Sequence, residues 1–452
     1  MRILRRRRTT ALRAAALCAV LSFVAACISG SSGRNESVVS GGVPFPRSAV
    51  YWLTQDHLPA AEELARYDVV VIDSEWAHRV DKSFFQDLRH RHPGILLLAY
   101  ANVVDYPPRL GSAGYYADRY RLWQYTSSTR SHFPKEWLAH TASGALITQW
   151  PGTVMANLAD TAPEVDGETY AEYAANWVVD TVWSSGVWDG IFLDVWGDRI
   201  YGADRDSWDV DDDGIDDPAS AIYGADSPWE RGITSAETIL RERMPGAVLV
   251  ANGDRTLKRQ LLDGRVFESF ADPVADRGGP TNDLHAYVSD ASSEAHHEPG
   301  VALNINVRRA PAGSPRSLAD ARFYLTATLL QDGYWAPMGA DYGETAWYDE
   351  LDGAGAGPGY LGLPKGRGPT WDELTASFDG GVGTVAPGVF RRDFEHGIVL
   401  TNTSDSTRTV DLDGTFRKLR GAQDPIVNDG SSVTSVVLPP HDGLILLRPE
   451  DA

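Results

Sequence analysis

The stretch that decides the fold is Gly190-Ile191-Phe192-Leu193-Asp194-Val195-Trp196, a short apolar run that ends on a carboxylate and a tryptophan. A short, continuous apolar run is typical of a strand that is buried on both faces of a parallel sheet. In a parallel barrel, the C-terminal ends of the strands form the mouth where catalysis takes place. An aspartate beside an aromatic ring at such a mouth is typical of a sugar-cleaving site, and a solvated strand end or helix cap is the alternative.

Seven other runs of the same kind occur along the chain, with helical patterns between several of them. The eight candidate strands are residues 49–53, 68–72, 95–99, 190–193, 247–250, 265–267, 301–305 and 333–336. The clearest helical stripe has apolar residues at 3.6-residue spacing from Tyr170 to Val182. Strands that alternate with helices over about 300 residues predict an α/β fold, the (β/α)₈ TIM barrel, over residues 47–351. A doubly wound open sheet is the alternative, which the lack of a glycine-rich phosphate loop disfavours.

After Leu351 the composition changes. Residues 352–381 are rich in glycine and proline, which predicts a linker or a loop that covers the barrel mouth. Residues 382–448 alternate short strand patterns with turn signals, which predicts a small C-terminal all-β, sandwich-like domain. Its candidate strands include residues 397–402, 407–412, 416–419 and 433–438, with Asn428-Asp429-Gly430 as a hairpin signal.

The N-terminus is typical of an export signal. Residues 1–26 hold six arginines followed by an apolar run that is too short to span a bilayer. The run ends Val24-Ala25-Ala26-Cys27, which resembles the lipobox of bacterial lipoproteins, and predicts that Cys27 is lipidated after cleavage. An ordinary secretion signal cut near Ala26 is the alternative. Residues 27–46 then form a Ser/Gly-rich tether, so we expect an exported bacterial lipoprotein, anchored in a membrane and facing the periplasm or the cell exterior.

Charge and cysteine content restrict the partners. The formal net charge is −21, and without the arginines of residues 1–26 the mature chain carries about −27. This acidic charge argues against nucleic-acid binding, which needs a basic surface, and favours a neutral or cationic ligand.

The two cysteines are Cys18, in the signal, and Cys27, so neither is left for a disulfide or a thiolate metal site. The 14 tryptophans and 18 tyrosines suit a polysaccharide or oligosaccharide substrate. We expect a monomer.

Glycoside hydrolysis uses two carboxyl groups that flank the scissile bond. Asp194 ends the fourth candidate strand and Glu268 ends the sixth, so we predict this pair as the catalytic residues, with no cofactor for catalysis. Other polar or aromatic residues near strand ends are candidates for substrate binding, although capping, ion pairing or a structural role is the alternative for most of them. These candidates are Asp73, Glu75, Asn102, Trp196, Asp198, Asn252, Asp254 and Asn304.

A second pattern, Asp209-Val210-Asp211-Asp212-Asp213-Gly214-Ile215-Asp216-Asp217, resembles a calcium loop. Acidic residues at positions 1, 3, 5 and 9 and glycine at position 6 match the first part of an EF-hand loop. Position 12 is Ser220 instead of the usual glutamate. We predict a structural Ca²⁺ near Asp194, and a solvated acidic loop is the alternative. The predicted ligands are Asp209, Asp211, Asp213, Ile215 and Asp217.

Three segments resemble a known group of TIM-barrel families. They are Tyr67-Asp68-Val69-Val70-Val71-Ile72-Asp73, the stretch from Trp137-Leu138 through Gly144 to Trp150-Pro151-Gly152, and Trp188-Asp189-Gly190-Ile191-Phe192-Leu193-Asp194. The chain resembles hypothetical glycosyl hydrolase family 15 over residues 48–448, and is more distantly similar to endo-α-1,4-polygalactosaminidases and α-galactosidases. Residues 394–402 and 439–444 resemble the family's β-domain.

The resemblance implies a carbohydrate-active barrel in which a fourth-strand aspartate, here Asp194, is the nucleophile. The α-galactosidase-like pattern has an aspartate on the sixth strand where this chain has Glu268, so the identity of the acid/base residue and the choice between retention and inversion stay open. We expect a surface-anchored glycoside hydrolase. The alternative is a non-catalytic polysaccharide-binding lipoprotein on a degenerate barrel. An esterase is disfavoured, because no Ser–His pair lies at the strand ends.

Overall fold

The computed structural model describes residues 42–54, 56–106, 122–123, 133–200, 206–255, 261–275, 278–291 and 300–449. The predicted export signal, Cys27 and most of the predicted tether lie outside these residues. Within the described part of the chain, the structure contains no helix that is both long enough and apolar enough to cross a membrane.

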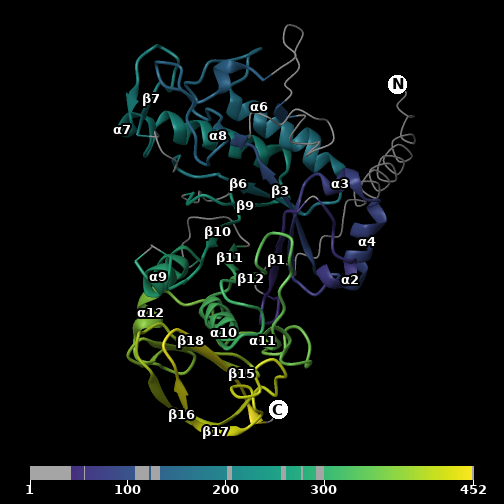
Figure 1. Cartoon of the computed structure of the whole chain (residues 1–452), viewed down its shortest axis with the longest axis vertical. Helices are drawn as coiled ribbons and strands as arrows, with labels where there is room; N and C mark the ends of the chain where they lie inside the picture. Colours follow the sequence, from purple (N-terminus) through teal and green to yellow (C-terminus); the bar gives the residue numbers. More distant parts are fainter. Residues whose placement is uncertain are drawn as a thin grey trace, which may run out of the picture. The chain divides into compact units, whose positions relative to one another are not determined.

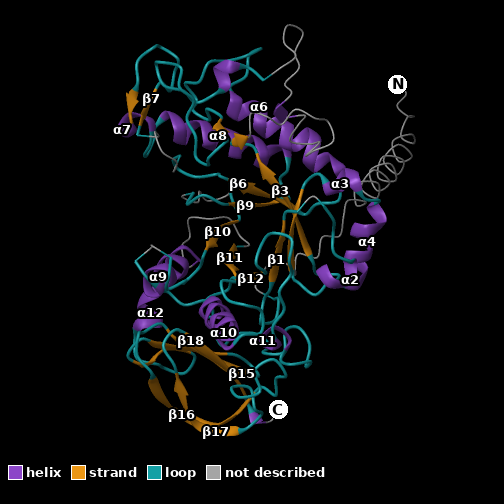
Figure 2. Ribbon diagram, viewed as in Figure 1, coloured by secondary structure: helices purple, strands orange, loops and turns teal. Residues whose placement is uncertain are grey.

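Eight parallel strands form one sheet in the order β1-β2-β3-β6-β9-β10-β11-β12 (Figures 1 and 2). A parallel bridge between Ser48 and Trp335 joins the first strand to the last, and the amide of Trp335 donates to the carbonyl of Arg47 at 3.1 Å. The predicted (β/α)₈ barrel is therefore confirmed, and the doubly wound alternative is wrong. The strands are β1 (Ala49–Trp52), β2 (Val69–Asp73), β3 (Leu96–Asn102), β6 (Gly190–Asp194), β9 (Val248–Ala251), β10 (Gly264–Glu268), β11 (Val301–Val307) and β12 (Tyr334–Met338).

Helices follow most of the strands and cover the outer face of the barrel. Their first turns carry ordinary caps: the Ser227 hydroxyl accepts from the amide of Glu230 at 3.3 Å, with Pro228 at the first helical position of α8. The helices are α2 (Ala61–Leu64), α3 (Trp76–Arg79), α4 (Lys82–Arg91), α6 (Tyr170–Trp177), α7 (Ala219–Ile222), α8 (Pro228–Arg243), α9 (Pro280–Ala291), α10 (Pro315–Leu329), α11 (Asp349–Asp352) and α12 (Trp371–Thr375). The predicted stripe from Tyr170 begins as α6 and continues as a π-helical turn, Val178–Val182.

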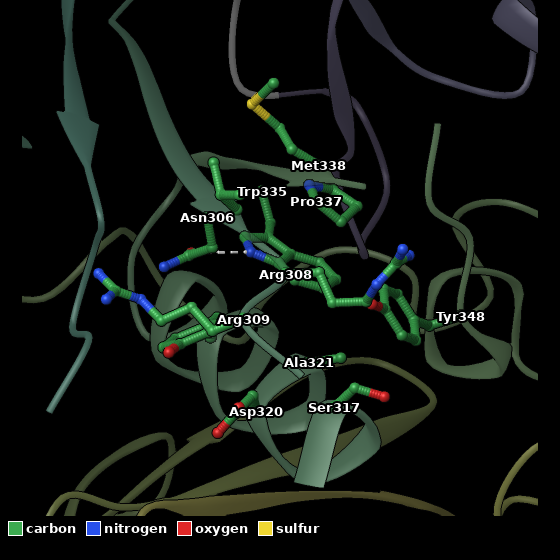
Figure 3. A pocket seen from close by; sticks show the side chains of 12 residues that line it. Asn306, Arg308, Arg309, Ser317, Asp320, Ala321, Trp335, Pro337, Met338 and Tyr348 are labelled. Carbon is green, nitrogen blue, oxygen red and sulfur yellow. Dashed lines mark hydrogen bonds between the residues drawn. The ribbon is translucent and has the colours of Figure 1, made fainter. Parts of the chain in front are cut away.

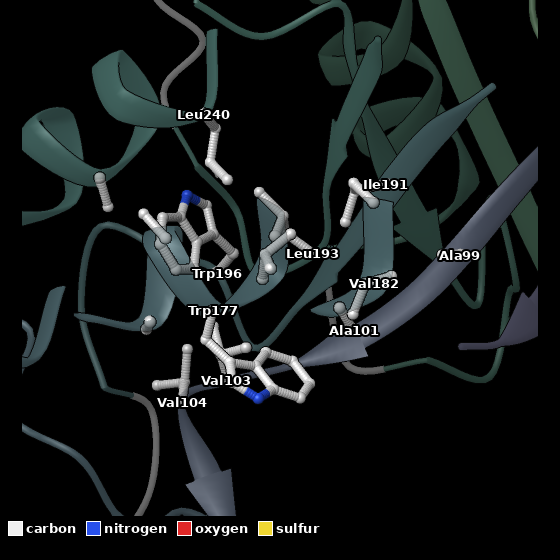
Figure 4. Close-up of a cluster of buried hydrophobic side chains, with 14 of the residues drawn as sticks. Ala99, Ala101, Val103, Val104, Trp177, Val182, Ile191, Leu193, Trp196 and Leu240 are labelled. Carbon is white, nitrogen blue, oxygen red and sulfur yellow. The ribbon is translucent and has the colours of Figure 1, made fainter. Parts of the chain in front are cut away.

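Side chains alternate between two apolar layers along each barrel strand. On β6, Phe192 belongs to the cluster that fills the barrel interior. Ile191 and Leu193 instead join the outer cluster, where they pack with Trp177 and Leu240 of the covering helices (Figure 4). Asp194, two residues after Phe192, therefore belongs to the inward-facing set.

The N-terminal end of β6 is fixed by its neighbours. Asp189 accepts hydrogen bonds from the guanidinium of Arg89 on α4, at 2.8 Å, and from the amide of Leu97 on β3, at 2.9 Å. A Cβ on Gly190 would overlap the carbonyl oxygen of Val248, so β6 and β9 approach more closely than a larger residue would allow. These contacts hold β6 in register and thereby set the height of Asp194.

The chain ends in a six-stranded antiparallel sheet with the order β13-β14-β15-β18-β16-β17. The predicted runs 407–412 and 416–419 are parts of one strand, β16, because the chain passes between them through a register shift rather than a turn. One face of the sheet packs on α10 (Figure 1). The strands are β13 (Val382–Ala386), β14 (Val389–Asp393), β15 (Gly397–Asn402), β16 (Arg408–Lys418), β17 (Ser432–Leu438) and β18 (Asp442–Leu447).

Two short two-stranded sheets lie in the long insertions between barrel strands. The first pairs β4 (Asp105–Tyr106) with β5 (Val154–Met155), and the second pairs β7 (Ser207–Trp208) with β8 (Asp217–Pro218). The second sheet brackets the acidic loop that the sequence predicts as a calcium site.

A buried ion pair ties the barrel to the C-terminal sheet. Arg322 of α10 donates to both carboxylate oxygens of Asp442, each at 3.0 Å, and to Asp424 at 2.6 Å. Arg322 is 3% exposed, and burial raises the pKa of the Asp442 carboxyl. Because removing one partner leaves the other charge buried, this contact is costly to break.

We expect Arg322→Ala to lower the free energy of unfolding by about 3–5 kcal/mol, because Asp442 keeps its buried charge without its cationic partner. The matched control is Arg316→Ala on the same helix, whose partner Asp320 is one turn away and whose side chain is 59% exposed. Its loss should stay below about 0.5 kcal/mol. Urea unfolding followed by circular dichroism measures both values, and equal losses would contradict the assignment.

Candidate active site at the barrel mouth

Asp194 and Glu268 face one another across the C-terminal end of the barrel. Asp194 ends β6 and Glu268 ends β10, and each lies two residues after a side chain of the interior cluster. Asn252, the first residue after β9, lies between them. Its Nδ2 is 2.8 Å from Oδ1 of Asp194 and 3.1 Å from Oε1 of Glu268. The structure thus brings together the two predicted catalytic residues and one predicted substrate-binding residue.

One amide nitrogen contacts an oxygen of each carboxyl group. The two N–H bonds of an amide diverge by about 120°, so two oxygens that each accept one linear hydrogen bond of these lengths would lie about 5 Å apart. Retaining glycosidases have carboxyl groups about 5–5.5 Å apart, and inverting enzymes need about 6.5–9.5 Å to admit a water molecule. An amide bridge of this geometry would therefore suit the retaining arrangement.

Three tyrosines surround the pair. The Tyr100 hydroxyl, from β3, donates to Oδ2 of Asp194 at 2.5 Å. The ring of Tyr51, from β1, lies 5.9 Å from that of Tyr100 and 5.9 Å from that of Tyr342, which follows β12. Sequence reasoning missed all three, although Tyr51 and Tyr100 occupy inward positions of the strand alternation that could have revealed them.

The pKa values of two of these tyrosines show how close they lie to the carboxylates. Burial raises the pKa of Tyr51 well above its ordinary value, and the negative charges of Asp194 and Glu268 raise it further. The same causes raise the pKa of Tyr342, whose side chain is half exposed. Both phenols therefore keep their protons at neutral pH and can donate hydrogen bonds.

Three other predicted binding residues lie at the ends of β2 and β3. Asp73 is fully buried, and its Oδ1 accepts from the amide of Glu75, which is also buried, at 3.1 Å. Asn102 pairs in register with Asp194, and its Oδ1 accepts from the amides of Val104 and Asp105 at 3.1 and 3.2 Å. These contacts shape the turns that leave the two strands.

Trp196 does not lie where the sequence predicts it. Its side chain is 1% exposed and lies in the buried apolar cluster (Figure 4). Its Nε1 donates to Glu237 of α8 at 3.0 Å. A ring enclosed by the outer apolar cluster cannot stack on a sugar. The reason is local, since Val195 adopts a positive φ of 57°, which interrupts the alternation of the strand just before Trp196.

The remaining predicted binding residues have structural partners. Asp198 pairs with Arg255 at 2.6 Å, and Asp254 pairs with Arg265 at 2.7 Å. Asn304 lies on the outer face of β11, where its Nδ2 donates to the Thr328 hydroxyl of α10 at 3.0 Å. The structure does not bring Asn304 to the mouth, because it occupies the outward position between Leu303 and Ile305 of the interior cluster.

The acidic loop brings three of its five predicted ligands together. Asp209, Asp211 and Asp217 each place an oxygen within 4.8 Å of the other two, and burial together with the charges of neighbouring aspartates raises the pKa of Asp211. Asp209 is buried and accepts from the amides of Asp213 and Gly214 at 3.0 and 2.8 Å. The carboxylate of Asp213 accepts from the amide of Ile215 at 2.8 Å. Calcium binding stays a prediction.

A small cavity lies beside the ends of β11 and β12, near the start of α10 (Figure 3). Its volume is about 20 Å³, and Trp335 Nε1 donates across its wall to Oδ1 of Asn306 at 3.1 Å. A cavity of this size holds a single water molecule rather than a sugar.

Comparison with solved structures shows a similarity of fold. Solved structures with a similar fold include the glycoside hydrolase domain of PelA from Pseudomonas aeruginosa, 17% identical, which covers 66% of this chain and 96% of that one with a TM-score of 0.38. A β-L-arabinopyranosidase of glycoside hydrolase family 27 from Geobacillus stearothermophilus is 10% identical and covers 92% and 99%, with a TM-score of 0.45. At these scores the likeness carries no argument about the reaction.

No curated protein matches the chain. Residues 89–398, however, match the family model described as hypothetical glycosyl hydrolase family 15, which confirms the resemblance seen in the sequence. The match covers more than half of the chain and includes Asp194, Asn252 and Glu268. The chain therefore belongs to hypothetical glycosyl hydrolase family 15, and it is a glycoside hydrolase by family.

Proposed function

We propose that this chain hydrolyses glycosidic bonds of a polysaccharide or oligosaccharide with Asp194 and Glu268 as its catalytic pair. The observation that carries the proposal is the Asn252 amide, which hydrogen-bonds one oxygen of each carboxyl group. Two carboxyl groups about 5 Å apart can flank one anomeric carbon. The family supports the class of reaction, and this geometry supports the choice of residues.

The two carboxyl groups take different roles in the proposed reaction. An oxygen of Asp194 attacks the anomeric carbon while Glu268 gives its proton to the leaving glycosidic oxygen, so one C–O bond forms and another breaks. Glu268 then removes a proton from water, the hydroxide oxygen bonds to the anomeric carbon, and Asp194 leaves as a carboxylate. Both oxygens of Asp194 accept a hydrogen bond, one from Asn252 and one from Tyr100, which fixes the plane of the attacking group.

Tyr342 is our candidate for the aromatic contact with substrate. Its side chain is 51% exposed, and its backbone carbonyl accepts from the amide of Leu53 at 3.1 Å, which holds the loop after β12 beside the loop after β1. An exposed ring next to the carboxylates suits the apolar face of a sugar. In this proposal Tyr342, rather than Trp196, makes the aromatic contact with the sugar. The acidic character of the chain favours a neutral or cationic glycan.

We also propose that the enzyme acts at a membrane surface as an exported monomer, facing the periplasm or the cell exterior. The support is the sequence of residues 1–27, with an arginine-rich start, a short apolar run and Cys27 after small residues. A lipid on Cys27 and the Ser/Gly-rich tether would let the barrel reach substrate near the membrane.

Asp194→Asn should lower kcat by on the order of 10⁴-fold or more on every substrate, because no nucleophile remains. Glu268→Gln should lower kcat by roughly 10²–10⁴-fold on an oligosaccharide, but much less for the first step on a 2,4-dinitrophenyl glycoside, whose leaving group needs no proton. A glycan and aryl-glycoside panel measures both. Asp180→Asn, an exposed acid paired with Arg243 on the outer helices, is the matched control.

Full hydrolytic activity in Asp194→Asn, with the fold intact by circular dichroism, would overturn the proposed function. Binding of oligosaccharides by the wild-type chain with no turnover across the panel would favour the non-catalytic alternative instead.

The first product released should keep the anomeric configuration of the substrate. A spacing of about 5 Å, as the Asn252 bridge favours, is that of retaining enzymes, in which Asp194 displaces the leaving group and water then displaces Asp194. Proton NMR of the anomeric signals during the first minutes of hydrolysis, before mutarotation, measures the outcome. An inverted first product would show that water attacks directly and that Asp194 acts as a base.

Calcium should stabilise the loop of residues 209–217. We expect about 5 mM Ca²⁺, above the roughly 10⁻⁴–10⁻³ M dissociation constants of extracellular calcium modules, to raise the melting temperature by a few degrees and EGTA to reverse it. Asp211→Asn should abolish the shift, and Asp405→Asn, an exposed acid paired with His441, should retain it. A melting temperature that does not respond to calcium would leave the loop as a solvated acidic turn.

A further inference from the structure

The backbone of Asn252 is clamped between β6 and the turn that follows it. Its amide donates to the carbonyl of Leu193 at 2.8 Å, and its carbonyl accepts from the amide of Trp196 at 2.6 Å. The backbone of Asn252 is therefore hydrogen-bonded to the residue before Asp194 and to the second residue after it. A shift of this residue relative to Asp194 would break both hydrogen bonds.

The turns after β6 and β9 touch backbone to backbone, because each has a glycine at the contact. A Cβ on Gly197 would overlap the carbonyl oxygen of Gly253, and a Cβ on Gly253 would come within 2.9 Å of the amide of Gly197. Gly253 also has a φ of 138°, which disfavours any other residue. Next to Asp194, Val195 holds a φ of 57°, a strained conformation for a β-branched residue. Strain of this kind persists only where the surrounding structure fixes the backbone.

The side chain of Asn252 is suited to hold two acids together. The carboxyl groups of Asp194 and Glu268 repel one another when both are charged. A neutral amide offers one N–H to each and has no proton to lose, so its contacts do not change when either acid changes its protonation state. An aspartate in its place would add a third negative charge, and an alanine would remove both donors.

We propose that Asn252 is a positioning residue that fixes the separation and orientation of Asp194 and Glu268; this inference rests on the proposed function. It differs from the sequence-based expectation that Asn252 contacts substrate. A substrate-binding amide affects mainly KM, whereas a positioning residue affects mainly kcat, because the substrate still binds but the reacting groups are misplaced.

The test compares three variants of the mature chain in detergent, with the 2,4-dinitrophenyl glycoside that the wild type hydrolyses fastest and with an oligosaccharide. Asn252→Ala should lower kcat by about 10²-fold on both substrates with KM changed by less than about threefold. Asn252→Asp should lose more than about 10³-fold in kcat, and Asn252→Gln, which keeps the donors one methylene further out, should lose about tenfold.

The matched control is Asn402→Ala, which removes a buried amide of the C-terminal sheet that donates to the carbonyls of Ser406, Leu438 and Pro439. This variant should lose thermal stability and keep its kcat within about twofold. The melting temperature of each Asn252 variant, read beside that of Asn402→Ala, separates a positioning effect from a general loss of stability.

The outcomes are distinct. A rise in KM with an unchanged kcat in Asn252→Ala would overturn the proposal in favour of substrate binding. Unchanged kcat and KM with a lower melting temperature would make Asn252 purely structural. Either result, obtained while Asp194→Asn is inactive, overturns this inference alone. Full activity of Asp194→Asn would instead overturn the proposed function on which it rests.

Discussion

The alternation of side chains along closed parallel strands is the constraint on which this site depends. Every second residue of a barrel strand faces the axis, and all strands end at the same mouth. Below the mouth, the inward layer that includes Phe192 and Val266 must be apolar to pack without solvent. The next inward position on each of these two strands has Asp194 or Glu268, where the packed core ends and solvent begins. The apolar layer therefore sets both the height and the direction of the carboxyl groups above it.

Two acids in one layer of a low-dielectric mouth repel one another, and a fold can offset this with a cation or with neutral donors. This chain has arginines close by, but Arg255 pairs with Glu237, and Arg265 pairs with Asp254 outside the barrel interior. Neutral groups, Asn252 and the Tyr100 hydroxyl, donate to Asp194 instead. A neutral amide orients the carboxylate without adding a counter-charge.

The sequence located the eight barrel strands to within a few residues, because strands buried on both faces are continuous apolar runs that few other elements imitate. It also placed Asp194 and Glu268 at strand ends. It did not distinguish inward from outward positions, so Asn304 entered the predicted site although its neighbours Leu303 and Ile305 are the inward residues. Contacts between strands could not be predicted, because the bridging role of Asn252 depends on the register of β9 against β6, which one sequence does not specify.

Trp196 illustrates how a prediction about substrate binding can fail while the residue still serves the site. Its indole is buried between the barrel and α8, where Nε1 donates to Glu237, and its backbone amide donates to the carbonyl of Asn252. Burying a side chain of this size stabilises the turn by about 2–3 kcal/mol, which is comparable to the cost of the strained φ of Val195. Burial of the large apolar ring therefore holds in place the turn that follows Asp194. The backbone amide of Trp196, through one hydrogen bond, also holds Asn252, the residue that bridges the two acids. An aromatic residue beside a candidate nucleophile need not face the substrate, because the reaction depends equally on what keeps the nucleophile still.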